Sequence, residues 1–167
     1  LHKSLHLRLN HVGIISTVLE QYGFMDIGSK KQAVEKLCGV QKYHVAFMSG
    51  RNVLTPAEAA SRLSSINKQI CDILGVETAE ADILRGFLFL PEDPLQWTTG
   101  MHELVEKLIA FRQSSISADD TAFLRECLKE TDSFVAAIRE DRFPETRGKL
   151  LFDALLLPQG RDQNYDF

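Results

Sequence analysis

Residues 29–52 read SKKQAVEKLCGVQKYHVAFMSGRN. Apolar side chains recur here every three or four positions, the spacing that is typical of an amphipathic helix. Serine is favourable just before a helix, and glycine often ends one. The pattern therefore predicts a helix from Ser29 to Leu37, a turn at Gly39 and a second short helix over residues 41–48. Residues 29–52 are thus predicted to form a helix-turn-helix-like segment.

The same segment is the most basic part of an acidic chain. Residues 30–51 contain five Lys or Arg and one acid, Glu35, which gives a net charge of +4. Residues 1–75 carry nine Lys or Arg against five Asp or Glu, whereas residues 76–167 carry ten against eighteen. This division is typical of a nucleic-acid-binding half joined to an acidic half, although a chance scatter of so few charges would also produce it.

Helical periodicity dominates the rest of the chain. Thr55 and Pro56 mark one helix start, because a threonine cap, a proline at the first helical position and Glu58 three residues after the cap occur together. We predict further helices over residues 8–22, 56–75, 78–90, 101–112, 117–141 and 144–158. In the first of these the β-branched residues leave an initial strand as the alternative.

The clearest break in the chain is formed by Pro91 and Pro94, since two prolines three residues apart rarely occur inside one regular element. We therefore predict a basic helical domain over residues 1–90, an acidic helical domain over residues 91–158 and a flexible tail over residues 159–167. The predicted class is all-α: a helix-turn-helix-like N-terminal bundle followed by an acidic helical C-terminal bundle.

Residues 33–45, AVEKLCGVQKYHV, resemble the helix-turn-helix of Cro- and lambda-repressor-like regulators. In that motif an apolar residue commonly follows the turn glycine by about six positions, as Val45 follows Gly39. Residues 66–77, INKQICDILGVE, resemble the packing helix near the end of such domains. The resemblance covers residues 29–80 and implies binding to double-stranded DNA, usually as a homodimer.

In such a motif the second helix would present Gln41 and His44 to base edges, while lysines and arginines would contact phosphates. The predicted DNA-binding residues are Lys30, Lys31, Gln41, Lys42, Tyr43, His44 and Arg51. The alternative is that the lysines only cover a solvated helix face.

Catalytic and metal-binding patterns are absent from the sequence. Residues 102–106, HELVE, lack the second histidine of the zinc-protease motif, and no phosphate-binding glycine loop occurs. Cys38, Cys71 and Cys127 are widely spaced, which favours reduced thiols in a cytoplasmic protein. The longest apolar runs are much shorter than the ~20 residues that span a membrane.

The sequence therefore predicts a non-enzymatic, sequence-specific DNA-binding transcription regulator, acting as a homodimer without a cofactor or metal. The alternative is a non-enzymatic helical adaptor or assembly protein that binds another protein through the acidic half.

Overall fold

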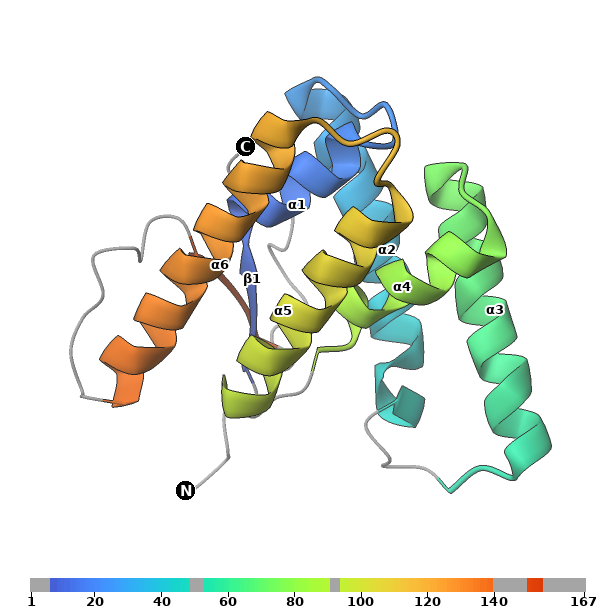
Figure 1. The fold of residues 1–167 in the computed structure, drawn as a ribbon. Coiled ribbons are helices and arrows are strands. Elements are labelled where there is room, and N and C mark those ends of the chain that lie inside the picture. Colours follow the sequence, from blue (N-terminus) through green and yellow to red (C-terminus); the bar gives the residue numbers. More distant parts are fainter. Residues whose placement is uncertain (1–6, 49–52, 91–93, 140–149, 155–167) are drawn as a thin grey trace.

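The computed structural model describes residues 7–48, 53–90, 94–139 and 150–154 (Figure 1). This part of the chain is mostly helical, which confirms the predicted all-α class, and one two-stranded antiparallel sheet is added to the helices. In chain order the elements are β1 (Leu7–His11), α1 (Val12–Glu20), α2 (Ile27–Met48), α3 (Pro56–Leu74), α4 (Thr78–Leu88), α5 (Pro94–Phe111), α6 (Ala118–Arg139) and β2 (Leu150–Ala154).

The predicted start of α3 is confirmed in detail. The Thr55 hydroxyl accepts a hydrogen bond from the Glu58 backbone N–H at 3.2 Å, and the Glu58 carboxylate accepts one from the Thr55 backbone N–H at 3.0 Å. This reciprocal pair satisfies two backbone groups that have no partner inside a helix. At the other end Gly75 adopts a left-handed conformation with φ +71°, and its N–H bonds to the Cys71 carbonyl oxygen.

The predicted break at Gly39 is wrong, because α2 is one continuous helix of 22 residues. The residues that α2 buries are Lys30, Ala33, Val34, Val40, Gln41 and His44. At about 100° per residue they fall within an arc of about 120°, so the buried positions stay in phase through Gly39. One uninterrupted helix therefore buries the apolar residues that we assigned to two.

Replacing Gly39 by alanine is expected to raise the free energy of unfolding by about 1 kcal/mol, because alanine is the better residue inside a helix. A methyl group at Gly39 would meet nothing within 4 Å. Urea unfolding followed by circular dichroism measures the change. Gly75→Ala is the matched control and should destabilise the protein, since its φ of +71° disfavours a side chain. If Gly39→Ala instead destabilised the protein, the result would support the predicted turn at Gly39.

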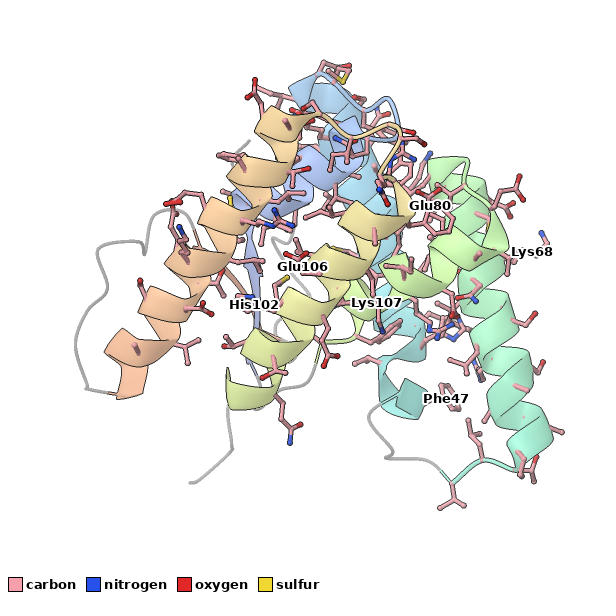
Figure 2. All side chains as sticks on the ribbon, in the orientation of Figure 1. Phe47, Lys68, Glu80, His102, Glu106 and Lys107 are labelled. Atoms are coloured by element: carbon pink, nitrogen blue, oxygen red, sulfur yellow. The ribbon has the colours of Figure 1, made fainter. Side chains whose placement is uncertain are left out.

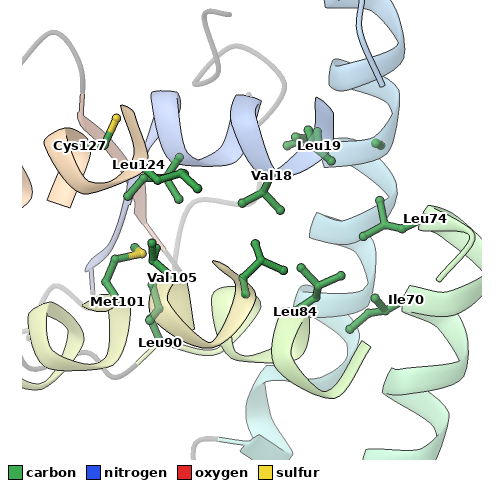
Figure 3. Close-up of a cluster of buried hydrophobic side chains, with 14 of the residues drawn as sticks. Val18, Leu19, Ile70, Leu74, Leu84, Leu90, Met101, Val105, Leu124 and Cys127 are labelled. Carbon is green, nitrogen blue, oxygen red and sulfur yellow. The ribbon is translucent and has the colours of Figure 1, made fainter. Parts of the chain in front are cut away.

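One hydrophobic cluster holds the helices together. It contains residues of α1 to α6, including Val18, Ile70, Leu84, Val105 and Leu124 (Figure 3). The predicted boundary between residues 1–90 and 91–158 therefore does not coincide with a division of the core. The predicted tail, residues 159–167, lies outside the described residues.

The packing of α4 on α5 continues the core across this boundary. A Cβ atom added to Gly86 of α4 would overlap the methyl groups of Leu104 on α5, so the two helices approach closely there. Glycine permits this approach because it has no side chain.

The two ends of the described chain pair as strands. β1 and β2 run antiparallel, with Leu9 opposite Phe152 and His11 opposite Leu150. β1 confirms the alternative prediction for residues 8–22, an initial strand, and α1 follows it. The helix predicted over residues 144–158 is wrong at residues 150–154, which form β2. Backbone pairing with β1, more than 130 residues away in the sequence, outweighs the local helical pattern.

Candidate nucleic-acid interface

One side of α2 faces solvent along its length. From residue 31 onwards, the exposed residues of α2 are Lys31, Gln32, Glu35, Lys36, Gly39, Lys42 and Tyr43. At about 100° per residue they occupy an arc of about 140°, opposite the buried residues. Three lysines on one helix face, against Glu35 alone, make this the side of α2 that would attract an anionic partner.

An aromatic and basic cluster lies at the C-terminal part of this helix, where α2 packs against α3. The guanidinium carbon of Arg62 lies 3.5 Å from the centroid of the Phe47 ring and 5.6 Å from that of Tyr43. Figure 2 shows Phe47 between α2 and α3. Cation–π attraction holds the positive charge of Arg62 beside Tyr43, of which 69% is exposed. We call Lys31, Lys36, Lys42, Tyr43 and Arg62 the basic face.

Three of the predicted DNA-binding residues are buried instead, and the first two are Lys30 and Gln41. Lys30 is 6% exposed, and its ammonium group donates to Ser16 Oγ and Glu20 Oε1, both at 2.7 Å. Gln41 is 4% exposed, and its side-chain N–H donates to the Leu88 carbonyl oxygen at 2.7 Å. Both side chains therefore connect α2 to α1 and α4 and are not accessible to DNA in this conformation.

His44, which we also predicted to face DNA, is only 1% exposed. Its Nδ1 lies 3.5 Å from Arg62 Nη1, and its Nε2 lies 3.2 Å from Gln69 Nε2. Burial lowers the pKa of His44, and the positive charge of Arg62 lowers it further. The neutral imidazole joins α2 to α3 and does not face solvent.

The stability of the protein is expected to fall as the pH drops from about 7 towards 5. The pKa of His44 in the folded protein lies below its ordinary value of 6.5, so the unfolded chain takes up the proton first and acid favours unfolding. Urea midpoints measured across this pH range should decrease less steeply for His44→Gln than for the wild type. If the urea midpoints of the two proteins fell equally with pH, protonation of His44 would not be the cause of the loss of stability.

The remaining predicted residues divide between exposed and undescribed positions. Lys31, Lys42 and Tyr43 are exposed, as a role in binding requires, and Arg51 lies outside the described residues. Sequence reasoning missed Lys36, which is exposed and lies on the same side of the helix as Lys42 because α2 does not break at Gly39. It also missed Arg62, which reaches Tyr43 through the packing of α3 on α2 and has no local signal in the sequence.

The two described histidines outside α2, His11 and His102, have structural contacts. The Nδ1 atom of His11 accepts the Gly13 backbone N–H at 2.9 Å, so Nε2 carries the proton and donates to Glu130 at 3.0 Å. His102 of α5 pairs with Asp132 of α6 at 2.9 Å. In the part of the chain that is described, no three His, Cys, Asp or Glu side chains gather as a metal site. None of its helices combines the length and the apolar character needed to cross a membrane.

Comparisons of this chain with models of protein families, with curated proteins and with solved structures gave no match. The resemblance to Cro- and lambda-repressor-like regulators, based on residues 33–45 and 66–77, therefore stays a prediction.

Proposed function

We propose that this protein binds double-stranded DNA through the basic face and that it is not an enzyme. The observation that carries the proposal is the set of three lysines on one solvent-exposed side of α2, with Arg62 stacked beside exposed Tyr43. Lys31 and Lys42 are about 16 Å apart along the helix axis, from the rise of 1.5 Å per residue. Over that length a DNA duplex presents several phosphates.

Binding through this face would depend mainly on phosphates. Gln41 and His44, the side chains predicted to read bases, are buried. Lysine and arginine contacts to phosphate carry no direct sequence information, whereas Tyr43 can stack or donate a hydrogen bond. We therefore propose weak sequence preference. We also propose that the protein acts as a homodimer in transcription regulation. A DNA probe with two sites one helical turn apart would test the homodimer.

The test measures DNA binding as a function of salt. Fluorescence anisotropy of a labelled 20-base-pair duplex should detect binding at 50 mM salt, with about 40-fold weaker affinity at 200 mM if three phosphate contacts are made. The triple variant Lys31→Ala, Lys36→Ala, Lys42→Ala should lose most of this binding and of its salt dependence. No binding by the wild type at 50 mM salt would contradict the proposal.

A second triple variant controls for total charge. Lys68, Lys107 and Lys129 are exposed lysines on α3, α5 and α6, outside the basic face. Replacing all three by alanine removes the same charge and should leave most of the affinity intact. Equal losses in the two triple variants would indicate non-specific attraction and not a defined face.

A second candidate function, that of a protein-binding adaptor, is favoured by a groove between α1 and α6. The groove has a volume of about 340 Å³, and its lining includes Ser16, Glu20, Asp120 and Phe123. Phe123 is 50% exposed and would contact an apolar side chain of a partner, while the carboxylates of Glu20 and Asp120 would attract basic ones. A partner segment with an apolar anchor and basic side chains would therefore complement the groove.

The adaptor function is tested with a matched pair of phenylalanines. Phe111, at the end of α5, is 49% exposed and does not line the groove. Cross-links to a partner in an extract of the source cells should disappear with Phe123→Asp and persist with Phe111→Asp. Their persistence in both variants would rule out this groove as the docking site.

A further inference from the structure

A pocket in the apolar core lies among α1, α2, α3 and α4. It has a volume of about 80 Å³ and thirteen lining residues. Val18 and Leu19 of α1 lie on one side, opposite Leu84 of α4 and Ile70 of α3 (Figure 3). Protein interiors are close-packed and rarely keep voids much larger than a water molecule. A pocket of this size within the main hydrophobic cluster is therefore a candidate site for a small molecule.

The half-buried residues of the lining indicate the side from which a ligand would enter the pocket. Leu37, Phe87 and Leu88 line it and are only partly buried, whereas Ile14, Ile70 and Leu84 are fully buried. A small molecule would thus enter between α2 and α4 and place its apolar part against the fully buried side chains. Burial of apolar surface would drive this entry.

Gln41 adds one strong hydrogen-bonding group to this apolar lining. Apart from the weakly polar thiol of Cys38, its side chain is the sole polar one among the thirteen lining residues. The Gln41 Nε2 atom donates to the Leu88 carbonyl oxygen, and this bond fixes which end of the amide is the oxygen. The amide oxygen has no protein partner among the described residues. Because Gln41 lines the pocket, its amide oxygen can accept a hydrogen bond from a donor on a ligand.

We propose that this pocket binds a small uncharged aliphatic molecule that carries one hydrogen-bond donor, such as a short-chain alcohol or primary amide. The lining contains no charged side chain, so a charged ligand would lose its hydration without compensation. The volume of about 80 Å³ is well below the ~150 Å³ cavity that admits benzene, so an aliphatic group fits better than an aromatic ring. The donor would bond to the Gln41 amide oxygen.

The experiment compares two isomers that differ in the donor. Ethanol carries a hydroxyl hydrogen, whereas dimethyl ether has the same formula without one, and both are much smaller than benzene. Methyl NMR spectra of the full chain should show saturable shifts at Ile14, Ile70 and Leu84 with ethanol. One added hydrogen bond corresponds to about fivefold tighter binding of the alcohol than of the ether. Absence of saturable shifts with both isomers would overturn the proposal.

Two variants separate the pocket from the donor contact. Gln41→Leu should abolish the preference for the alcohol while leaving weak binding of both isomers. Leu37→Phe should fill the side of entry and abolish binding, and the same spectra report whether each variant is folded. An unchanged preference in folded Gln41→Leu would overturn the role of the amide. If Gln41→Leu does not fold, Leu37→Phe and the isomer pair still decide whether the pocket binds. This site shares no residue with the basic face, so its failure leaves the DNA proposal intact.

Discussion

Replacing Arg112 by alanine is expected to lower the free energy of unfolding by about 3 to 5 kcal/mol, the cost of leaving one partner of a buried ion pair alone. Arg112 follows α5 directly. Its Nη1 donates to Glu80 Oε2 at 3.1 Å, and its Nη2 donates to the Gln21 carbonyl oxygen at 3.0 Å. Glu80 is only 7% exposed and lies between the start of α4 and the end of α5 (Figure 2).

Tyr22 completes this buried group. Its hydroxyl donates to Glu80 Oε2 at 2.6 Å, and the Arg112 guanidinium carbon lies 4.9 Å from the centroid of its ring. Burial raises the pKa of Tyr22, and Glu80 raises it further, so the hydroxyl keeps its proton. Without Arg112 the Glu80 carboxylate would retain a single side-chain partner in a mostly dry site.

Urea unfolding followed by circular dichroism measures the loss, and Arg125→Ala is the matched control. Arg125 makes a two-pronged ion pair with Glu106, at 3.1 and 3.2 Å, but both side chains are about half exposed. Its removal should change stability little, because exposed ion pairs contribute little. The double variant Arg112→Ala, Glu80→Gln should recover part of the loss, since no unpaired charge remains buried. Similar effects of Arg112→Ala and Arg125→Ala would show that burial of the pair does not matter.

Ile70→Ala and Leu124→Ala are each expected to lower the free energy of unfolding by about 2 to 5 kcal/mol. Both side chains have no exposed surface, and both belong to the one hydrophobic cluster. Ile70 lies in the predicted N-terminal domain and Leu124 in the predicted C-terminal one. Because they share a core, each substitution should shift the same cooperative unfolding transition.

Two probes distinguish this outcome from separate domains. The fluorescence of Trp97, the single tryptophan, reports on α5, and circular dichroism reports on all helices. The two probes should give one midpoint in the wild type and in each variant. If Ile70→Ala shifted the circular dichroism transition and left the Trp97 fluorescence transition unchanged, the result would support two separate domains divided between residues 90 and 91.

Local patterns predicted most of the helices. The start of α3 follows from Thr55, Pro56 and Glu58, whose side chains and ring geometry act within one helical turn. In α3 and α6 the apolar residues that recur every three or four positions likewise include buried ones, such as Ile66, Ile70 and Leu128. These local patterns predict the helices correctly because they depend only on helical spacing and on neighbouring backbone groups.

The candidate interface was predicted less well, because the predicted turn at Gly39 led us to assign buried side chains to the solvent-exposed side. With a turn at Gly39, Gln41 and His44 were assigned to solvent. In continuous α2 they lie on the buried arc, while Lys36 joins Lys31 and Lys42 on the exposed one. Glycine lowers helix stability by only about 1 kcal/mol, which packing of the buried arc outweighs.

The sequence by itself determined the helical class, the caps of α3 and the apolar faces of α3 and α6, because these depend on residues within a few positions of one another. Tertiary structure alone decided that α2 runs through Gly39, that residues 150–154 pair with β1, and that Glu80, Arg112 and Tyr22 meet. Those features depend on contacts between residues far apart in the chain, whose free energy exceeds the local preference of a single glycine or a short apolar run.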